Sequence, residues 1–398
     1  MNPFDFPRNG IRAIRNVIRS LRRRGLDYVM VPLEGSFPER APRRAPLPFP
    51  FSMVPLFPSE ISLEEMEYAV DVIGGDERVR GVVFRLDHLR ARPATLYTLR
   101  RMMLDLHARG KHTVAWLPAA ESWDYYLASA CDEVVMPPCA QLNVLGLRSE
   151  ALFLKETLGL IGIEADLESI AEYKVTPDMY RRSTMTEPHR EMLDAILDSY
   201  FDEFVAAIAE GRGLTPGRVR DLIDSMPMTP DEAVEADLID TIAYEDELGE
   251  YLSSSDTSST PANSHTPLLP WDDAARWLRR PTEWTTRRRI GVVSLEGQIA
   301  LGRSRRMPMP LPLPVEAQAG ADTVTRALRQ AEADPHIAAV ILLVDSPGGS
   351  SLASDLIWRE VRRLSERKPV VALMGEQAAS GGYYISAAAS HIVARPTT

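Results

Sequence analysis

The sequence predicts an α/β fold made of two tandem copies of one domain. Three observations predict this fold: a repeat at a nearly constant offset, short apolar runs, and helix-periodic segments between those runs. The segment Val82–Asp87 resembles Val340–Asp345, 258 positions later. Three further pairs follow in the same order, with offsets of 257 or 258: Lys111–Trp116 with Lys368–Leu373, Tyr125–Leu127 with Tyr383–Ile385, and Val134–Val135 with Ile392–Val393.

Each copy alternates strand-like and helix-like segments. Val340–Val344 and Val370–Met374 are short, continuous apolar runs, as expected for strands of a parallel sheet covered on both faces. Between them, apolar residues recur near helical spacing: Leu352, Leu356, Ile357, Val361 and Leu364. This alternation predicts parallel strands joined by crossover helices.

A mostly helical region and a linker separate the copies. A helical stripe covers Glu191–Ala209, and Thr229–Ile239 is expected to be a helix with Thr229 as N-cap and Pro230 at its first position. Residues 253–267 are rich in Ser, Thr, Asn and Pro, which predicts a flexible linker. We therefore expect four parts: a basic amphipathic arm (1–27), a first copy (28–252), a linker (253–288) and a second copy (289–398).

The basic arm contrasts with the chain as a whole, whose formal net charge is −11. Apolar residues of the arm recur at helical spacing: Ile11, Ile14, Ile18 and Leu21. Arginines fill its other faces: Arg12, Arg15, Arg19, Arg22 and Arg23. The pattern favours a helix lying on a membrane surface, where apolar burial and attraction to anionic lipid add. A basic helix packed on the domain is the alternative.

Composition excludes several other classes. With 45% apolar and 25% charged residues the chain is of globular type, and a pI near 5.3 argues against a general nucleic-acid binder. No run approaches the roughly 20 apolar residues of a membrane span, and no secretory signal peptide is visible. Cys131 and Cys139 fit neither a disulfide framework nor a zinc spacing, so we expect both to be small buried hydrophobes.

Two loops distinguish the second copy from the first. Residues 346–350 read Ser-Pro-Gly-Gly-Ser, and Ser380 is followed by Gly381 and Gly382, where the first copy has Ser122, Trp123 and Asp124. Both loops follow strands, where open α/β sheets bind ligands, and exposed backbone N–H groups there can form an oxyanion hole. The loops indicate a nucleophilic Ser380. The alternative is two tight turns with Ser380 as a helix N-cap.

A catalytic serine needs a base. The chain has no Gly-x-Ser-x-Gly elbow, and none of its seven histidines lies in a loop that distinguishes the second copy. A lysine can serve when burial and dipoles lower its pKa from about 10.4 toward about 7–8. Lys174 is the candidate in a chain where arginine dominates, and a plain surface lysine is the alternative.

The serine loops, the Met374-Gly375 pair and the Tyr173-Lys174 segment together resemble the S49 serine peptidases of the signal peptide peptidase A type, in their long two-copy form. The resemblance implies a ClpP/crotonase-like fold and a Ser–Lys dyad, with Ser380 as nucleophile and Lys174 as general base. It places backbone N–H groups of Gly349 and Gly381 in the oxyanion hole, and it implies no metal or other cofactor. The implied substrates are cleaved signal peptides at a bacterial inner membrane, and the implied assembly is a homo-oligomer without nucleic acid.

The chain departs from that family in three ways. Val175 stands where a small polar residue is common, and no transmembrane helix precedes the first copy. Relatives continue beyond the position of Thr398, so the second copy is expected to be incomplete at its C-terminus. A cytoplasmic location is the alternative to the membrane. The competing functions are a crotonase-like acyl-CoA enzyme and a non-catalytic membrane-associated scaffold of the same fold.

Overall fold

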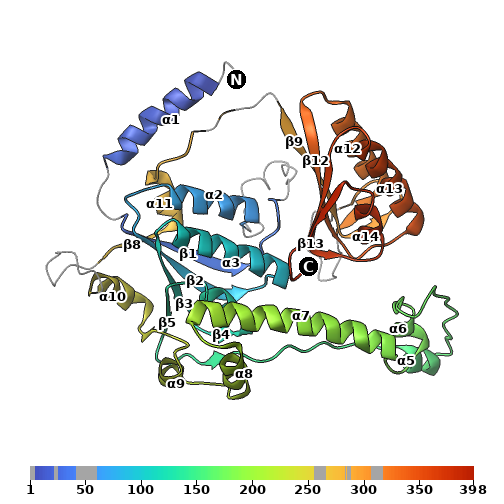
Figure 1. Cartoon of the computed structure of the whole chain (residues 1–398), viewed down its shortest axis with the longest axis horizontal. Coiled ribbons are helices and arrows are strands. Elements are labelled where there is room, and N and C mark those ends of the chain that lie inside the picture. The colour runs from blue at the N-terminus through green and yellow to red at the C-terminus, as the bar shows by residue number, and fades with distance from the viewer. Residues whose placement is uncertain are drawn as a thin grey trace, which may run out of the picture.

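The computed structural model describes residues 5–21, 26–41, 61–254, 266–282, 284, 288–305 and 317–398. Within these residues two larger sheets and two small two-stranded sheets form, and every pairing of their strands is parallel. Helices flank the two larger sheets, which lie side by side in Figure 1. The predicted α/β class is confirmed.

The first larger sheet has six strands in the order β7-β5-β3-β2-β1-β8. They are β1 (Tyr28–Gly35), β2 (Gly81–Leu89), β3 (His112–Trp116), β5 (Glu133–Met136), β7 (Thr241–Ile242) and β8 (Leu268–Pro270). The second has four strands in the order β14-β13-β12-β9. They are β9 (Arg289–Glu296), β12 (Ile337–Ser346), β13 (Val370–Ala378) and β14 (His391–Val393). The small sheets pair β4 (Ala120–Glu121) with β6 (Leu142–Asn143), and β10 (Gln298–Ala300) with β11 (Gln318–Gly320).

The duplication predicted from the repeat is visible in the strand order. The run β5-β3-β2-β1 of the first sheet corresponds to β14-β13-β12-β9 of the second. The register agrees as well, because Val82 lies opposite Thr113 and Val340 lies opposite Val370. Val340 lies 258 positions after Val82, and Val370 lies 257 positions after Thr113, so the two copies pair the same positions. The boundaries of the four expected parts remain a prediction.

Helices occupy the predicted connections. In the first copy and the segments around it they are α1 (Asp5–Ser20), α2 (Leu63–Gly74), α3 (Pro93–Ala108), α4 (Ser122–Ala128), α5 (Lys155–Leu160), α6 (Asp178–Arg181), α7 (Glu187–Arg212), α8 (Pro216–Asp224), α9 (Pro230–Glu235), the 3₁₀ turn η2 (Glu245–Glu247), α10 (Leu248–Ser254) and α11 (Trp271–Trp277). In the second copy they are α12 (Ala321–Ala333), α13 (Ser351–Ser365) and α14 (Gly381–Ser386). The helices expected over 191–209 and 352–364 are thus confirmed as parts of α7 and α13.

The helix expected over Thr229–Ile239 is shorter than predicted. Thr229 caps it as expected, its side chain accepting a hydrogen bond from the N–H of Glu232, and Pro230 is the first helical residue. The helix ends at Glu235, because Asp237 takes the left-handed backbone conformation, with φ 58°. The remaining residues turn back toward the sheet, where Leu238 and Ile239 are buried.

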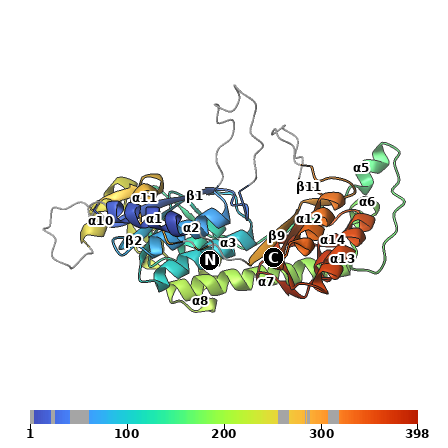
Figure 2. The same cartoon turned by 90° about the horizontal axis from the view of Figure 1, so that it is seen from above.

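Helix α7 joins the two halves of the molecule. Its C-terminal part packs on the first copy, where Phe204 and Ile208 are buried. Its other end runs toward α5 and α6, and Figures 1 and 2 show these helices beside the second copy. A segment that is continuous with the first copy therefore reaches the serine-bearing half.

The basic arm forms helix α1, as predicted, and it packs on the protein through polar side chains. Arg12 donates to the carbonyl oxygen of Pro281 (3.2 Å), and Arg19 donates to that of Arg276 (3.1 Å). These two arginines, expected on a membrane, are therefore engaged within the chain. Arg22 and Arg23, like linker residues 255–265, lie outside the described residues.

Two further expectations concern burial and membrane crossing. Cys131 is buried as expected, but the same expectation for Cys139 was wrong, because Cys139 lies on an exposed turn after Met136. In the part of the chain that the structure describes, no helix combines the length and the apolar character that crossing a bilayer demands.

Candidate active site

Ser380 lies on a sharp turn between β13 and α14. Its backbone has φ 49° and ψ −113°, a combination that is strained for a residue with a side chain. The turn is fixed by hydrogen bonds from the N–H of Gly382 to Ala379 and from the N–H of Tyr384 to Ser380. Ser380 occupies the N-cap position, yet its hydroxyl makes no capping bond. The hydroxyl is exposed and available for another partner.

That partner is Lys174. Its Nζ donates to Ser380 Oγ at 2.8 Å, although the two residues are 206 positions apart. Lys174 comes from the segment between α5 and α6, which is continuous with the first copy. Both side chains are exposed in the described structure, so the burial that the sequence argument required of a lysine base is not provided here.

A buried carboxylate holds the lysine segment in shape. Asp178 is 3% exposed and accepts from Arg181 at 2.7 Å and from Arg182 at 3.2 Å. Arg181 also donates to Ser169 Oγ and to the carbonyl oxygen of Leu167, which closes the loop that carries Lys174. Sequence reasoning missed this clamp, since these charged residues followed no recognisable spacing.

The glycine loop after β12 packs directly against the serine turn. Gly348 has φ 99°, and a Cβ on it would lie 2.8 Å from the backbone N of Gly381 and from Ser380 Cβ. A Cβ on Gly349 would lie 2.2 Å from the carbonyl oxygen of Ile299. Such approaches exclude any side chain. The two loops singled out in the sequence thus meet, and Gly348 joins the glycines already expected there.

The two predicted oxyanion donors both lie beside Ser380. A β-bridge to Ile299 holds the glycine loop. The N–H of Ile299 donates to the carbonyl oxygen of Gly348, and the N–H of Ser350 donates to that of Ile299. The N–H of Gly349 takes no part in this bridge. Gly381 is the first residue of α14, so its N–H has no partner within the helix. The assignment of these two donors remains a prediction.

Open cavities flank the serine on two sides. One, of about 730 Å³, is lined by Lys174, Ser380, Gly349 and residues of the lysine segment. The other, of about 690 Å³, lies between Ser380 and α13, where Tyr384 donates to Asp355 at 2.8 Å. Together they could receive an extended peptide on either side of the hydroxyl. Among the described residues no group of three or more His, Cys, Asp or Glu side chains is placed to hold a metal ion.

The corresponding serine of the first copy is arranged differently. Ser122 Oγ donates to the carbonyl oxygen of Leu145 and accepts from its N–H, both at 2.8 Å. Both hydrogen-bonding roles of this hydroxyl are therefore filled by backbone. This arrangement fits a first copy without a nucleophile, as does the presence of Trp123 and Asp124 where the second copy has Gly381 and Gly382.

A joint between the copies holds the serine strand against the first copy. Glu376 of β13 accepts from the N–H groups of Thr95 (2.7 Å) and Ala94 (3.2 Å), which lie in the first turn of α3 and so have no partner within the helix. Desolvation raises the pKa of Glu376, and the nearby Asp345 carboxylate adds to the rise. A salt bridge of 2.6 Å between Arg395 and Glu39 also joins the two copies. None of these contacts was predicted from the sequence.

Comparison with known proteins agrees with the motif analysis. A model described as "Peptidase family S49" matches residues 106–256 and 362–398. A relative named "Serine protease SPPA, chloroplastic" from Arabidopsis thaliana is 31% identical over 86% of this chain and 50% of its own length. "Protease 4" of Haemophilus influenzae is 28% identical over 86% of this chain and 55% of its own.

Comparison with solved structures finds two of low overall similarity. One is a mutant of the "1510-N membrane-bound stomatin-specific protease", at a TM-score of 0.34 and 12% identity, covering 61% of this chain and 92% of its own. Another is "ClpP1 from Listeria monocytogenes", at a TM-score of 0.30 and 10% identity, covering 55% of this chain and 94% of its own.

By its sequence relationships the chain resembles proteins named as proteases, one of them a serine protease. More particularly, it resembles peptidase family S49, whose model matches two segments of the chain. The chain spans about half the length of the curated relatives it matches, at 50% and 55% of theirs.

Proposed function

We propose that this chain is a serine endopeptidase in which Ser380 is the nucleophile and Lys174 the general base. The observation that carries the proposal is the 2.8 Å contact between Lys174 Nζ and Ser380 Oγ. That distance lies within the reach needed for direct proton transfer. The uncapped hydroxyl of Ser380, compared with the fully bonded hydroxyl of Ser122, supports the same choice.

The geometry supports an acyl-enzyme mechanism. As general base, Lys174 accepts the hydroxyl proton while Ser380 Oγ attacks the scissile carbonyl carbon. The N–H groups of Gly349 and Gly381 stabilise the negative oxygen of the tetrahedral intermediate. The lysine ammonium then gives its proton to the leaving amine, which departs as the C–N bond breaks and an ester forms on Ser380. Water, deprotonated by Lys174, hydrolyses that ester and restores the serine.

The finer parts of the proposal concern substrate, place and assembly. We propose that the substrates are apolar peptides such as cleaved signal peptides, that the protein works at a bacterial membrane surface, and that it self-associates. The S49 relationship supports the first, and the amphipathic helix α1 supports the second. Light scattering across a concentration series tests self-association, and a constant monomer mass would refute it.

The dyad is tested with a fluorogenic apolar peptide and a serine-reactive fluorophosphonate probe. Ser380→Ala and Lys174→Ala should each lower turnover by at least about 10³-fold. Lys174→Arg is the sharper variant, since it keeps the charge but a guanidinium cannot accept the proton, so it should be equally inactive. Ser122→Ala is the matched control and should keep full activity.

Labelling of Ser380 that depends on Lys174 would support the dyad. Folded parent protein with neither turnover nor labelling would refute the peptidase and favour the non-catalytic scaffold.

A further inference from the structure

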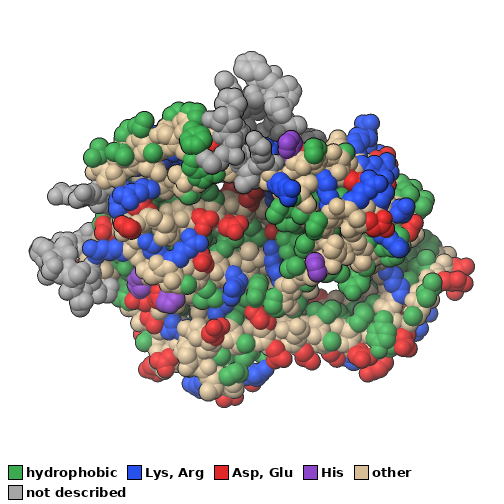
Figure 3. All heavy atoms as spheres, turned by 45° about the horizontal axis from the view of Figure 1, so that its top comes forward, with side chains coloured by type: hydrophobic (Ala, Val, Ile, Leu, Met, Phe, Trp, Pro, Cys, Tyr) green, Lys and Arg blue, Asp and Glu red, His purple; other side chains and the backbone are tan. Residues whose placement is uncertain are grey.

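Helix α1 presents its apolar side to solvent. The exposed fractions of its large apolar residues are high: Phe6 58%, Ile11 53%, Ile14 64%, Val17 63%, Ile18 56%, and the following Leu21 78%. Figure 3 shows hydrophobic side chains gathered over this helix at the upper left. An amphipathic helix on a globular protein normally turns such a stripe toward the core. Here the orientation is reversed.

Polar contacts fix that reversed orientation. The side chain of Asn16 pairs with the backbone of Arg280 in both directions, donating to its carbonyl at 2.9 Å and accepting from its N–H at 3.1 Å. Arg19 donates to the carbonyl of Arg276, one of the free carbonyls in the last turn of α11. Asn9 is buried, so the stripe facing the protein is polar along its whole length.

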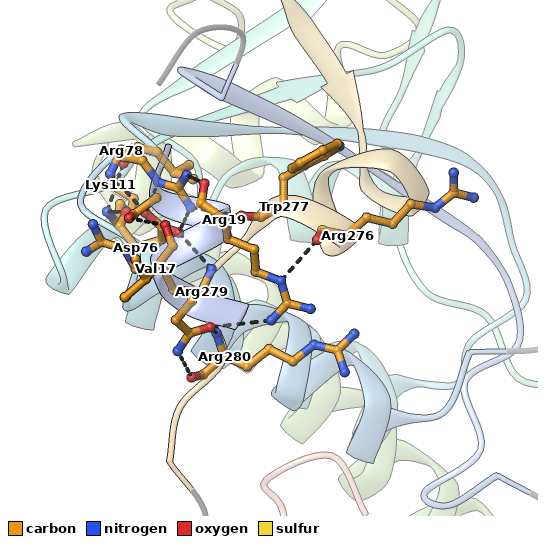
Figure 4. A network of polar contacts seen from close by, with 12 residues as sticks. Val17, Arg19, Asp76, Arg78, Lys111, Arg276, Trp277, Arg279 and Arg280 are labelled. Carbon is orange, nitrogen blue, oxygen red and sulfur yellow. Dashed lines mark hydrogen bonds and ion pairs between the residues drawn. The ribbon is translucent and has the colours of Figure 1, made fainter. Parts of the chain in front are cut away.

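A second network ties the end of α1 to the first copy. Arg78 donates to the carbonyl oxygens of Arg19 (2.7 Å) and Trp277 (2.9 Å) while it is paired with the fully buried Asp76. Asp76 also accepts from the N–H of Arg279 at 2.9 Å. Figure 4 shows this group between α1 and residues 276–280. The helix cannot roll its apolar side inward without breaking these bonds.

The chemistry around the exposed stripe indicates what covers it. Arg15 is exposed and lies four positions from Ile11 and three from Ile18, so its guanidinium borders the stripe. At the N-terminal end, Phe6 and Trp284 form an edge-to-face pair with centroids 5.5 Å apart, and Trp284 is 46% exposed. An apolar stripe bordered by arginine and ended by tryptophan matches the interfacial layer of an anionic bilayer.

The size of the stripe argues against a second copy of the chain as the occupant. At 1.5 Å per residue, this 16-residue helix is about 24 Å long, and with a width of ~10 Å it offers on the order of 250 Å². A stable protein interface needs about 800 Å² from each partner.

We infer that α1 binds an anionic lipid surface through this exposed apolar stripe, with its polar side serving as the attachment to the protein. The inference rests on the proposal that the protein works at a membrane. It assigns the membrane contact to the apolar residues of α1 in place of Arg12 and Arg19. Arg12 and Arg19 orient the helix from the protein side, while Ile14, Ile18 and their neighbours enter the lipid.

The test is co-sedimentation of the whole chain with vesicles of phosphatidylcholine and phosphatidylglycerol, and with vesicles of phosphatidylcholine alone. The double variant Ile14→Ser with Ile18→Ser should weaken binding to the anionic vesicles by about tenfold or more. Arg15→Gln should weaken it by about fivefold and reduce the difference between the two vesicle types. Circular dichroism confirms that the variants stay folded.

The matched control removes two apolar side chains that are even more exposed and lie at the far end of the molecule, Leu160→Ser with Ile161→Ser, which are 88% and 68% exposed in the parent. It should bind as the parent does. Equal binding by the α1 variant, or equal weakening by the control, would overturn the inference. So would loss of a lipid-free dimer in the α1 variant, which would assign the stripe to a second copy.

A parent that binds neither vesicle would overturn both this inference and the proposed membrane location. Because vesicle binding is read without substrate, none of these results bears on the Ser–Lys dyad. The two proposals can therefore fail independently.

Discussion

The tyrosine pairs that follow the two repeat serines have the same sequence but different surroundings. Tyr125 and Tyr126 of the first copy are fully buried, whereas Tyr383 and Tyr384 of the second are 58% and 43% exposed. Helix α7 makes the difference, because its Phe204 stacks on Tyr126 with ring centroids 6.2 Å apart. Burial raises the pKa of Tyr125 and of Tyr126. A repeated sequence therefore specifies the turn, and the elements that pack on it decide whether it is core or surface.

The largest effect on stability is expected in the first copy, at Arg100, which packs beside Tyr126. Arg100 is buried against Tyr126 and donates to the carbonyls of Tyr126 and Ala207 and to Ser129 Oγ. Arg100→Met should lower the free energy of unfolding by about 3 kcal/mol, because these buried acceptors lose their donor. Urea titration followed by circular dichroism measures it.

The repeat supplies the control for this prediction. Trp358, which lies 258 positions after Arg100, stacks on Tyr384 with centroids 5.8 Å apart and is only partly buried. Trp358→Met should cost about 1 kcal/mol. Equal costs at the two positions would contradict the view that α7 creates the difference.

The second effect concerns the glycine loop, which only the second copy has. Gly348→Ala places a Cβ 2.8 Å from the backbone N of Gly381 in a left-handed conformation, so the serine turn must shift. A displacement of about 1 Å at a nucleophile lowers turnover by roughly 10²-fold. Peptide turnover measures the effect. Arg90→Ala, at the corresponding exposed position of the first copy, should leave turnover unchanged.

The third effect separates two roles of Glu376 at the joint. Glu376→Ala removes the acceptor for the N–H groups of Ala94 and Thr95 and should cost about 1.5 kcal/mol of unfolding free energy. Glu376→Gln keeps an acceptor and should cost little at neutral pH.

The sign of the pH dependence follows from the raised pKa of Glu376. A carboxyl whose pKa is raised on folding favours the folded state below its ordinary pKa, and this contribution is lost as pH rises through the raised value. The free energy of unfolding of the parent, relative to that of Glu376→Gln, should therefore fall as the pH is raised from acid to neutral. A constant difference across that range would contradict the assignment.

The smallest effect is a pH dependence of the unfolding free energy that comes from His112 of the first copy. His112 lies between Tyr28 (2.9 Å) and Glu133 (3.4 Å), and the hydrogen bond to Glu133 raises the pKa of the imidazole above 6.5. Its contribution is full below the ordinary pKa and is lost as pH rises through the raised one. Because the pair is partly exposed, we expect less than about 1 kcal/mol.

Urea titrations of the parent and of His112→Gln between mildly acid and mildly alkaline pH measure this contribution. The second copy has Pro369 at the corresponding position, which cannot titrate. A variant with the same pH dependence as the parent would assign the titration to another group.

The sequence carried the parts of this structure that depend on local pattern or on the repeat. The duplication of the sheet followed from the repeat, and the loops of Ser380 and Gly349 were recognisable by their glycines. Lys174 was selected by resemblance and elimination, and the structure brings it beside Ser380.

What the sequence did not predict depends on contacts between distant elements. The amphipathic pattern of α1 gives two faces without saying which one packs on the protein. The Asp178–Arg181 clamp and the Glu376 joint are formed by ordinary charged residues whose partners lie on other elements or loops. The exposure of Cys139 likewise follows from where its turn lies and not from its residue type.

The separation of Lys174 from Ser380 along the chain has a consequence for synthesis. The two residues are 206 positions apart. At about 5–20 residues per second, the lysine leaves the ribosome roughly 10 to 40 s before the serine does. During that interval the nascent first half can fold without an active nucleophile. Under the proposed dyad, proteolytic capacity begins only when the second half docks, so the lysine-bearing half is inactive until then.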